Sequence, residues 1–384
     1  MNMETKNVFI SDLLSIQTPA FVVDKSALQQ NLNILGNVKQ RTGCKILLAL
    51  KGFAMFHLFP MIRETLDGVC ASSQDEAQLG REEFNKEVHS FAAAFSDWEF
   101  ESILNYSDHI VFNSFNQWKR FQDQIPQTIS CGIRINPEHS EGTIPIYDPC
   151  GKGSRLGVRR IDFDEKDITG ISGFLFHTLC EQNSDALERT VAVVEKSFGK
   201  YLHHLSWLNF GGGHHITRHN YDIDLLCKII ETIKTRYQLE IYLEPGEAVV
   251  LNAGYLVASV LDIIQNDISI AILDTSAATH MTDVLEMKYR PHVMGSYKNG
   301  DTPYSYRLAG MSCLAGDVIG EYAFKQPLHI GDKLIFTDMA HYTMVKTNTF
   351  NGIRLPSICV YDAFNRSVET VRVFEYEDYK MRLS

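Results

Sequence analysis

Residues 45–51 read KILLALK, a short apolar run that ends in a lysine. Seven more apolar runs follow at helix-length intervals. The eight runs span residues 45–50, 67–71, 88–93, 109–113, 130–135, 171–176, 206–210 and 240–243. The spacers between them, such as 73–84 and 185–198, are amphipathic. Eight strand-like runs that alternate with helical spacers predict an α/β fold, a (β/α)₈ TIM-type barrel.

Residues able to do chemistry follow directly after these runs. In a (β/α)₈ barrel the active site lies at the C-terminal ends of the strands. A lysine there can bond to an aldehyde cofactor, a glycine turn can bind phosphate, and a carboxylate can hold a pyridine nitrogen. Each residue alone also has an ordinary structural explanation, but together they predict a pyridoxal phosphate (PLP) site formed by Lys51, His177, Gly211, Gly212, Gly213 and Glu244.

Composition narrows the classes of partner. The chain has 384 residues and a net charge of −11, which argues against nucleic acid and membrane surfaces and fits a cationic substrate. The eight cysteines form no C-x-x-C pair, and the adjacent His214 and His215 do not share a face, so we interpret both histidines as structural and expect no metal. The N-terminal residues carry acids and no apolar signal segment, which favours a cytoplasmic protein.

The sequence pattern changes after Gly246. Residues 248–260, 269–273, 333–337 and 357–361 resemble strands, and turn signals lie between or beside them. We therefore predict a barrel domain over 27–249 and a β-rich domain formed by 1–26 with 250–384. The apolar run at 20–24 is expected to join the β-rich domain, and Ser26 to cap the helix that follows.

Longer motifs resemble the fold type III PLP enzymes, the alanine racemase/ornithine decarboxylase-like group, over nearly the whole chain. The motifs are TPAFVVD, ALKGFAM, FHTLCEQN, NFGGGHHIT, LEPGEAVV, THMTDVLEM, CLAGDVIGEY and YTMVKTNTFNG. HTLCEQN, EPGE and CLAGD are most similar to the carboxynorspermidine/carboxyspermidine decarboxylase branch. The resemblance implies decarboxylation of a small cationic carboxylated polyamine in polyamine biosynthesis, by a homodimer with shared active sites.

The resemblance also implies roles for the cofactor residues. Lys51 would bind PLP covalently, His177 would stack on its ring, Gly211–Gly213 and Tyr342 would hold the phosphate, and Glu244 would hold the pyridinium.

Further roles concern catalysis and the substrate. Cys313 would donate a proton from the partner subunit. Glu247, Asp283 and Asp317 would contact the substrate amines, and Arg155 would lie near the site. The group usually has EPGR where this chain has EPGE, so Glu247 replaces a phosphate-binding arginine and favours a cation.

Other readings remain open from the sequence. Another fold type III decarboxylase, of the diaminopimelate or arginine type, is the nearest, although EPGE argues against it. A racemase would need a tyrosine base opposite Lys51, where CLAGD offers a cysteine and an acid. A PLP-binding regulatory protein usually lacks the β-rich domain, and a barrel without PLP would give a colourless protein. The sequence does not separate carboxynorspermidine from carboxyspermidine.

Overall fold

The computed structural model describes residues 3–142, 145–287 and 289–384, with side chains from Phe9 onward. The chain divides into two compact units, which we call the barrel unit (Asn31–Val249) and the β unit (Met1–Gln30 with Val250–Ser384). The boundaries predicted from the sequence lie at 26/27 and 249/250.

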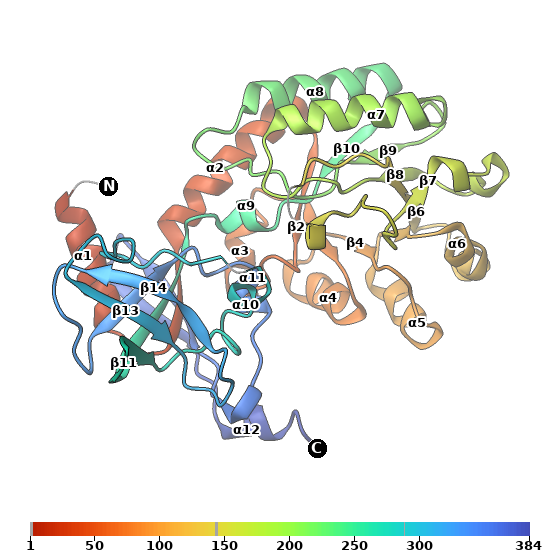
Figure 1. The fold of residues 1–384 in the computed structure, drawn as a ribbon. Coiled ribbons are helices and arrows are strands. Elements are labelled where there is room, and N and C mark those ends of the chain that lie inside the picture. The colour runs from red at the N-terminus through yellow and green to blue at the C-terminus, as the bar shows by residue number, and fades with distance from the viewer. Residues whose placement is uncertain (1–2, 143–144, 288) are drawn as a thin grey trace. The chain divides into compact units, whose positions relative to one another are not determined.

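The barrel unit is a closed ring of eight parallel strands (Figure 1). Pairing of β2 with β10 and of β5 with β6 leaves no free edge between them, so the predicted (β/α)₈ barrel is confirmed. The two-residue strand β7 (Val158–Arg159) pairs with β6 beside the ring. The barrel strands are β2 (Lys45–Ala49), β3 (Gly68–Ala71), β4 (Glu87–Phe91), β5 (His109–Phe112), β6 (Ser130–Asn136), β8 (Gly173–Leu175), β9 (Trp207–Asn209) and β10 (Glu240–Leu243).

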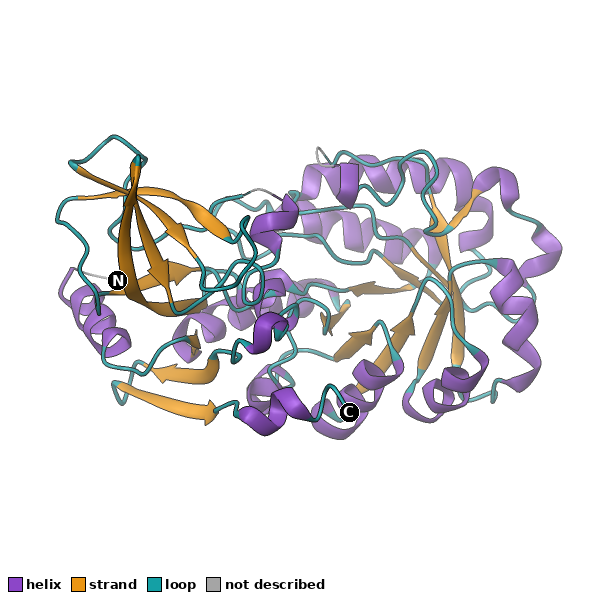
Figure 2. Cartoon of the chain, turned by 60° about the horizontal axis from the view of Figure 1, so that its bottom comes forward, coloured by secondary structure: helices purple, strands orange, loops and turns teal. Residues whose placement is uncertain are grey.

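Helices surround this ring (Figure 2). They are α2 (Lys25–Thr42), α3 (Phe59–Ile62), α4 (Gln74–Leu79), α5 (Asp97–Tyr106), α6 (Phe115–Phe121), α7 (Ser184–Leu202) and α8 (Ile223–Tyr237), and α9 (Glu247–Val250) follows the last strand. The first turn of α2 is capped by Asp24, whose carboxylate accepts from the N–H groups of Ser26 and Ala27. The predicted cap at Ser26 is therefore wrong by two residues. None of the described helices is long and apolar enough to cross a membrane.

The barrel interior is packed with Leu47, Val111, Leu175, Trp207 and Tyr242, and two glycines make room for the largest of these side chains. The Trp207 indole lies where a Cβ atom on Gly173 or Gly132 would stand, at 2.0 and 2.3 Å from its ring atoms. Its Nε1–H donates to Ser130 Oγ at 2.9 Å, so the buried polar atom is satisfied. The barrel is thus a packed core, and ligand binding is left to its ends.

A polar cluster closes the N-terminal end of the barrel. The rings of His89 and His109 stack at 3.9 Å and 9°, and His89 Nε2 lies 3.3 Å from Glu87 Oε2. Lys45 pairs with Glu87 at 2.5 Å. The Tyr242 hydroxyl also reaches Glu87. Burial lowers the pKa of His109 to about 3, assisted by His89 and Lys45. Its ring is therefore neutral at physiological pH.

The β unit is built around a mixed sheet in the order β14-β13-β12-β11-β1-β16-β17, and β15 pairs with β11. The strand predicted at 20–24 is β1 (Ala20–Asp24), between β11 and β16. The other strands are β11 (Gly254–Asn266), β12 (Ile268–Leu273), β13 (Tyr304–Ala309), β14 (Val318–Phe324), β15 (Lys333–Thr337), β16 (Ser357–Asp362) and β17 (Ser367–Arg372). The helices are α1 (Met3–Leu14), α10 (Asp283–Met287), α11 (Tyr342–Val345) and α12 (Tyr376–Lys380). The strand predicted from 248 begins at Gly254, because the preceding residues form α9.

Candidate active site

Lys51 follows strand β2 at the C-terminal mouth of the barrel, and its side chain is exposed. Three groups from neighbouring strand ends interact electrostatically with its charge. Burial is the main influence on the pKa values of His177, Glu76 and Cys70, lowering the first and raising the other two, and the nearby Lys51 charge acts to lower all three. Lys51 therefore lies near these three groups at the barrel mouth.

His177 follows β8 and is held as a neutral imidazole. The N–H of Gly212 donates to its Nδ1 at 2.7 Å. A ring nitrogen that accepts carries no proton, which places the single proton on Nε2. Burial, with Lys51 and Arg134 nearby, lowers the pKa of His177 well below its usual range. A flat, uncharged ring in this position suits stacking on a pyridine ring.

The triglycine turn after β9 is a tight fit that only glycine allows. A Cβ on Gly213, whose φ is +81°, would lie 1.9 Å from the carbonyl oxygen of Leu179. Two of its three N–H groups are used internally, Gly211 donating to Asn209 and Gly212 to His177. Among the described residues no acceptor is found for the N–H of Gly213, so this is the donor of the turn that remains for an anion.

Glu244 follows strand β10 and is held from two sides. Asn209 Nδ2 donates to its Oε1 at 2.7 Å, and its own N–H donates to the carbonyl of Gly211 at 2.8 Å. Asn209 thus holds both the triglycine turn and this carboxylate, which fixes their separation. A carboxylate oriented by an amide donor is suited to accept from a protonated ring nitrogen.

These residues fit pyridoxal phosphate. The chain offers an exposed lysine, a neutral imidazole, an anion-binding turn without side chains and an oriented carboxylate, all at adjacent strand ends of one barrel. The geometry inside the barrel unit thus accommodates each part of the cofactor with a donor or acceptor of the right kind.

Sequence reasoning missed several residues of this mouth. Glu76, in the first turn of α4, accepts from the N–H of Ser72 at 2.6 Å, and burial raises its pKa. Arg134, buried on β6, donates to the His177 carbonyl at 3.1 Å. The capping pattern Ser73-x-x-Glu76 was a local signal for the first. Nothing local distinguishes Arg134 or Asn209 from ordinary strand residues.

The β unit brings a second group of predicted residues together. Cys313 lies in a loop, and its thiol is exposed. The backbone N–H of Cys313 donates to Asn351 Oδ1 at 2.8 Å. Asp317 is buried and accepts from four donors. The donors are Ser276 Oγ and the N–H groups of Ala277, Ala278 and Ser312. A carboxylate has about four acceptor positions, so these bonds leave little capacity for a substrate amine. Asp317 is therefore placed to join the Cys313 loop to the 276–278 loop.

Asp283, also predicted to contact substrate, has a cation from its own chain. Lys346 forms ion pairs with both Asp283 and Glu286. Tyr342 is the first residue of α11, whose end precedes Lys346. The residues of the β unit and those of the barrel unit are thus each gathered within their own unit.

Glu247 begins α9, and its carboxylate lies 3.3 Å from His215 Nε2. The interpretation of His215 as purely structural is therefore incomplete, because the next strand end brings an acid to it. Arg155 lies in the loop beside Asn113, whose side-chain amide donates to its carbonyl at 2.8 Å.

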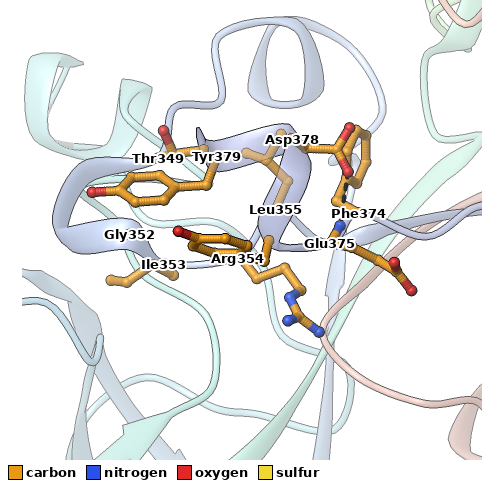
Figure 3. Close-up of a pocket in the computed structure, with 10 residues that line it drawn as sticks. Thr349, Gly352, Ile353, Arg354, Leu355, Phe374, Glu375, Asp378 and Tyr379 are labelled. Carbon is orange, nitrogen blue, oxygen red and sulfur yellow. Dashed lines mark hydrogen bonds between the residues drawn. The ribbon is translucent and has the colours of Figure 1, made fainter. Parts of the chain in front are cut away.

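A small cavity of the β unit holds none of the predicted residues (Figure 3). Its volume is about 90 Å³, well below the roughly 300 Å³ from which small-molecule pockets begin. It is lined by Thr349, Gly352, Ile353, Arg354, Leu355, Phe374, Glu375, Tyr376, Asp378 and Tyr379.

Comparisons with known proteins agree with this geometry. The family described as "Pyridoxal-dependent decarboxylase, C-terminal sheet domain" matches residues 20–340. A carboxynorspermidine/carboxyspermidine decarboxylase of Campylobacter jejuni is 44% identical over 378 residues, which cover 96% of this chain and 98% of the relative. A carboxyaminopropylagmatine decarboxylase of Synechocystis is 46% identical over 378 residues, covering 97% and 96%.

A solved structure shows the same fold. The carboxynorspermidine decarboxylase of C. jejuni complexed with norspermidine has a TM-score of 0.90 and 42% identity, covering 96% of this chain and all of that one. With the lysine, imidazole, glycine turn and carboxylate at the strand ends, these matches assign the reaction class. The chain belongs to the pyridoxal-dependent decarboxylase family and is a PLP-dependent carboxy-lyase.

Proposed function

We propose that the protein decarboxylates carboxynorspermidine, carboxyspermidine or both, giving norspermidine or spermidine. The observation that carries the proposal is the carboxylate of Glu247 at the barrel mouth, beside His215 and next to the cofactor residues. The C. jejuni relatives act on this class of substrate by name, and one binds norspermidine. A polyamine supplies the cationic groups that this acid requires.

A second substrate is favoured by the Synechocystis relative. Its name describes a carboxylated aminopropyl derivative of agmatine, which ends in a guanidinium rather than an ammonium group. Both substrates carry the same kind of reacting carboxylate, and they differ at the distant cationic end. Carbon dioxide release from a panel of these three compounds, together with diaminopimelate and arginine, tests the proposal. Activity confined to the amino acids would refute it.

We propose the following roles for the chain's residues. When bound, pyridoxal phosphate supplies the electron sink for the pair released as the Cα–carboxylate bond breaks. Lys51 would bind the cofactor, His177 would lie against its ring, and Glu244 would accept a hydrogen bond from its nitrogen. Gly211–Gly213, through the N–H of Gly213, and Tyr342 would hold the phosphate. Cys313 Sγ would give a proton to Cα.

The cofactor lysine is tested by mapping. Borohydride treatment of the holoenzyme should fix the cofactor's mass to the peptide that contains Lys51. Lys51→Ala should lose that modification and the visible absorbance, whereas Lys45→Ala, at the opposite end of β2, should keep both. An unchanged absorbance band in Lys51→Ala would remove Lys51 from the site.

We also propose a cytoplasmic homodimer with shared active sites. All eight cysteines are free thiols, which suits a reducing compartment. The exposed Cys313 is flanked by exposed Met311 and Leu314, an apolar surface suited to a second subunit. Mixing Lys51→Ala chains with Cys313→Ala chains should restore part of the activity, because one hybrid site would then be complete. Verified heterodimers without recovery would contradict sharing.

A further inference from the structure

The clearest unassigned cluster of the barrel mouth joins the ends of three consecutive barrel strands. It consists of Glu181 after β8, His215 after β9 and Glu247 after β10, and we call it the acid–imidazole cluster. One ligand-type atom from each residue lies within 4.8 Å of the others. Neither Glu181 nor His215 has a role in the cofactor site described above.

The backbone around the cluster is fixed. Gln182 donates its N–H to the carbonyl of Gly213 at 3.1 Å, and His215 donates its N–H to Gln182 at 3.3 Å, so the two loops pair like short strands. Thr217 Oγ1 donates to the Ala248 carbonyl at 2.6 Å, which ties α9 to the same loop. Glu181 itself adopts a left-handed φ of 56°. Strain of this kind in a non-glycine residue persists only where the surroundings hold it.

Two features of the cluster indicate a cationic ligand. Glu181 and Glu247 place two carboxylates close together, an arrangement that a shared cation stabilises. His215 is 7% exposed, and neither of its ring nitrogens has a hydrogen-bond partner among the described residues, although Nε2 lies 3.3 Å from Glu247 Oε1. A buried imidazole beside this acid thus keeps hydrogen-bonding capacity for a group from outside the chain.

The size of the cluster accommodates an alkylammonium group. Acceptors around a tetrahedral nitrogen at hydrogen-bond distances of about 2.8 Å are separated by roughly 4.6 Å. Ligands around Zn²⁺ at about 2.1 Å are separated by only roughly 3.4 Å. The ligand atoms of the cluster all lie within 4.8 Å of one another, which leaves room for an ammonium group shared by the two carboxylates. His215 Nε2 lies 3.3 Å from Glu247 Oε1, so the imidazole contacts that acid directly.

We infer that Glu181 and Glu247 together bind an ammonium group of the polyamine chain, and that His215 positions Glu247. The inference rests on the proposed function and extends it, because it assigns Glu181 as a residue that determines specificity for a polyamine over an amino acid. The reacting carboxylate lies at the other end of such a substrate, so the cluster contributes to binding rather than to bond breaking.

Glu181→Gln tests the inference, with Glu188→Gln on α7 as a control that removes the same charge from an exposed position. Glu181→Gln should raise KM for the carboxylated triamine roughly tenfold, the scale of one lost charge-assisted hydrogen bond, with kcat and the cofactor absorbance unchanged. A carboxylated analogue that lacks the distal ammonium group should have the same KM with the wild type as with Glu181→Gln. His215→Gln should raise the same KM, and His215→Asn, whose amide is shorter, should raise it further.

Calorimetry with the triamine product separates the two proposals. If the wild type releases CO₂ from carboxylated polyamines but Glu181→Gln binds substrate and product normally, the inference fails and the proposed function stands. If the wild type is inactive, the proposed function fails.

Weaker triamine binding by Glu181→Gln than by wild type would still support the cluster, and equal binding would overturn it. Binding of Zn²⁺ at these residues without triamine binding would also overturn it. Thermal melting and Glu181→Asp exclude a folding defect as the cause.

Discussion

The stacked rings of His89 and His109, at the N-terminal end of the barrel, predict that the fold loses stability in mild acid. His109 is neutral in the fold because burial lowers its pKa to about 3, with His89 and Lys45 acting in the same direction and Glu87 against them. In the unfolded chain its pKa returns to about 6.5. A histidine whose folded pKa is depressed contributes its full stability above 6.5 and loses it as pH falls toward 3.

The magnitude follows from proton linkage. Between pH 7 and pH 5 the unfolded chain takes up about 0.7 proton at position 109, and the folded chain takes up almost none. The free energy of unfolding should therefore fall by about 2 kcal/mol over this window from this residue alone. Glu87, whose pKa is lowered to about 2, contributes its change below about 4.5, outside the window.

Urea unfolding followed by circular dichroism at several pH values between 5 and 7 measures the effect. His109→Gln loses the ring stacking at every pH, which lowers its free energy of unfolding by the same amount throughout. It should also lack about 2 kcal/mol of the wild-type pH dependence. His219→Gln, at an exposed position of the same unit, should keep the wild-type slope. A wild-type minus His109→Gln difference that stays constant from pH 7 to pH 5 would refute a neutral, buried His109.

Three further substitutions test the active-site residues. Gly213→Ala should weaken cofactor binding and lower the melting temperature, because its Cβ would clash with Leu179 in a conformation that costs about 1–3 kcal/mol for other residues; a normal cofactor dissociation constant would contradict this. Asp317→Asn should destabilise the β unit by about 1–3 kcal/mol by removing acceptors from buried donors, with cofactor absorbance retained, and an unchanged melting temperature would disagree. Lys346→Met should lower KM for the triamine substrate if Asp283 binds it, because the competing ion pair is lost, whereas a raised KM would mean that Lys346 positions the acid.

The barrel was predictable because its strands are buried on both faces and therefore appear as continuous apolar runs. The strands of the β unit were harder to predict, because several of them are not buried in this way. Strands β13 and β17 are half-exposed, with sequences such as SVETVR that contain few apolar residues. Their pairing partners, β12 for β13 and β16 for β17, complete the sheet through backbone hydrogen bonds, which leave no mark on side-chain pattern.

The site was predictable where a motif is local and not where it is tertiary. The triglycine turn and the lysine after β2 stand out in the sequence by themselves. The contact of His215 with Glu247 joins strand ends 32 positions apart, and reasoning from adjacent residues excluded it. Asn209 accepts from the N–H of Gly211 and donates to the carboxylate of Glu244. The second bond depends on the pairing of β9 with β10, which the local sequence does not show.

Charge at the barrel mouth explains why a polyamine suits this enzyme. Glu76, Glu181, Glu244 and Glu247 lie at the strand ends. The cations near them include Lys51, Arg134 and Arg218, and the Arg218 guanidinium donates to the Glu181 carbonyl at 3.2 Å. Binding a phosphate group adds further negative charge to this region, and the resemblance to the wider fold type III group implies an arginine at the position of Glu247. An amino acid substrate with a single side-chain cation would leave much of that excess uncompensated. A chain of several ammonium groups neutralises the acids distant from the ring while leaving the carboxylate at Cα exposed to the reaction. A glutamate at position 247 therefore suits a substrate that brings its own positive charge.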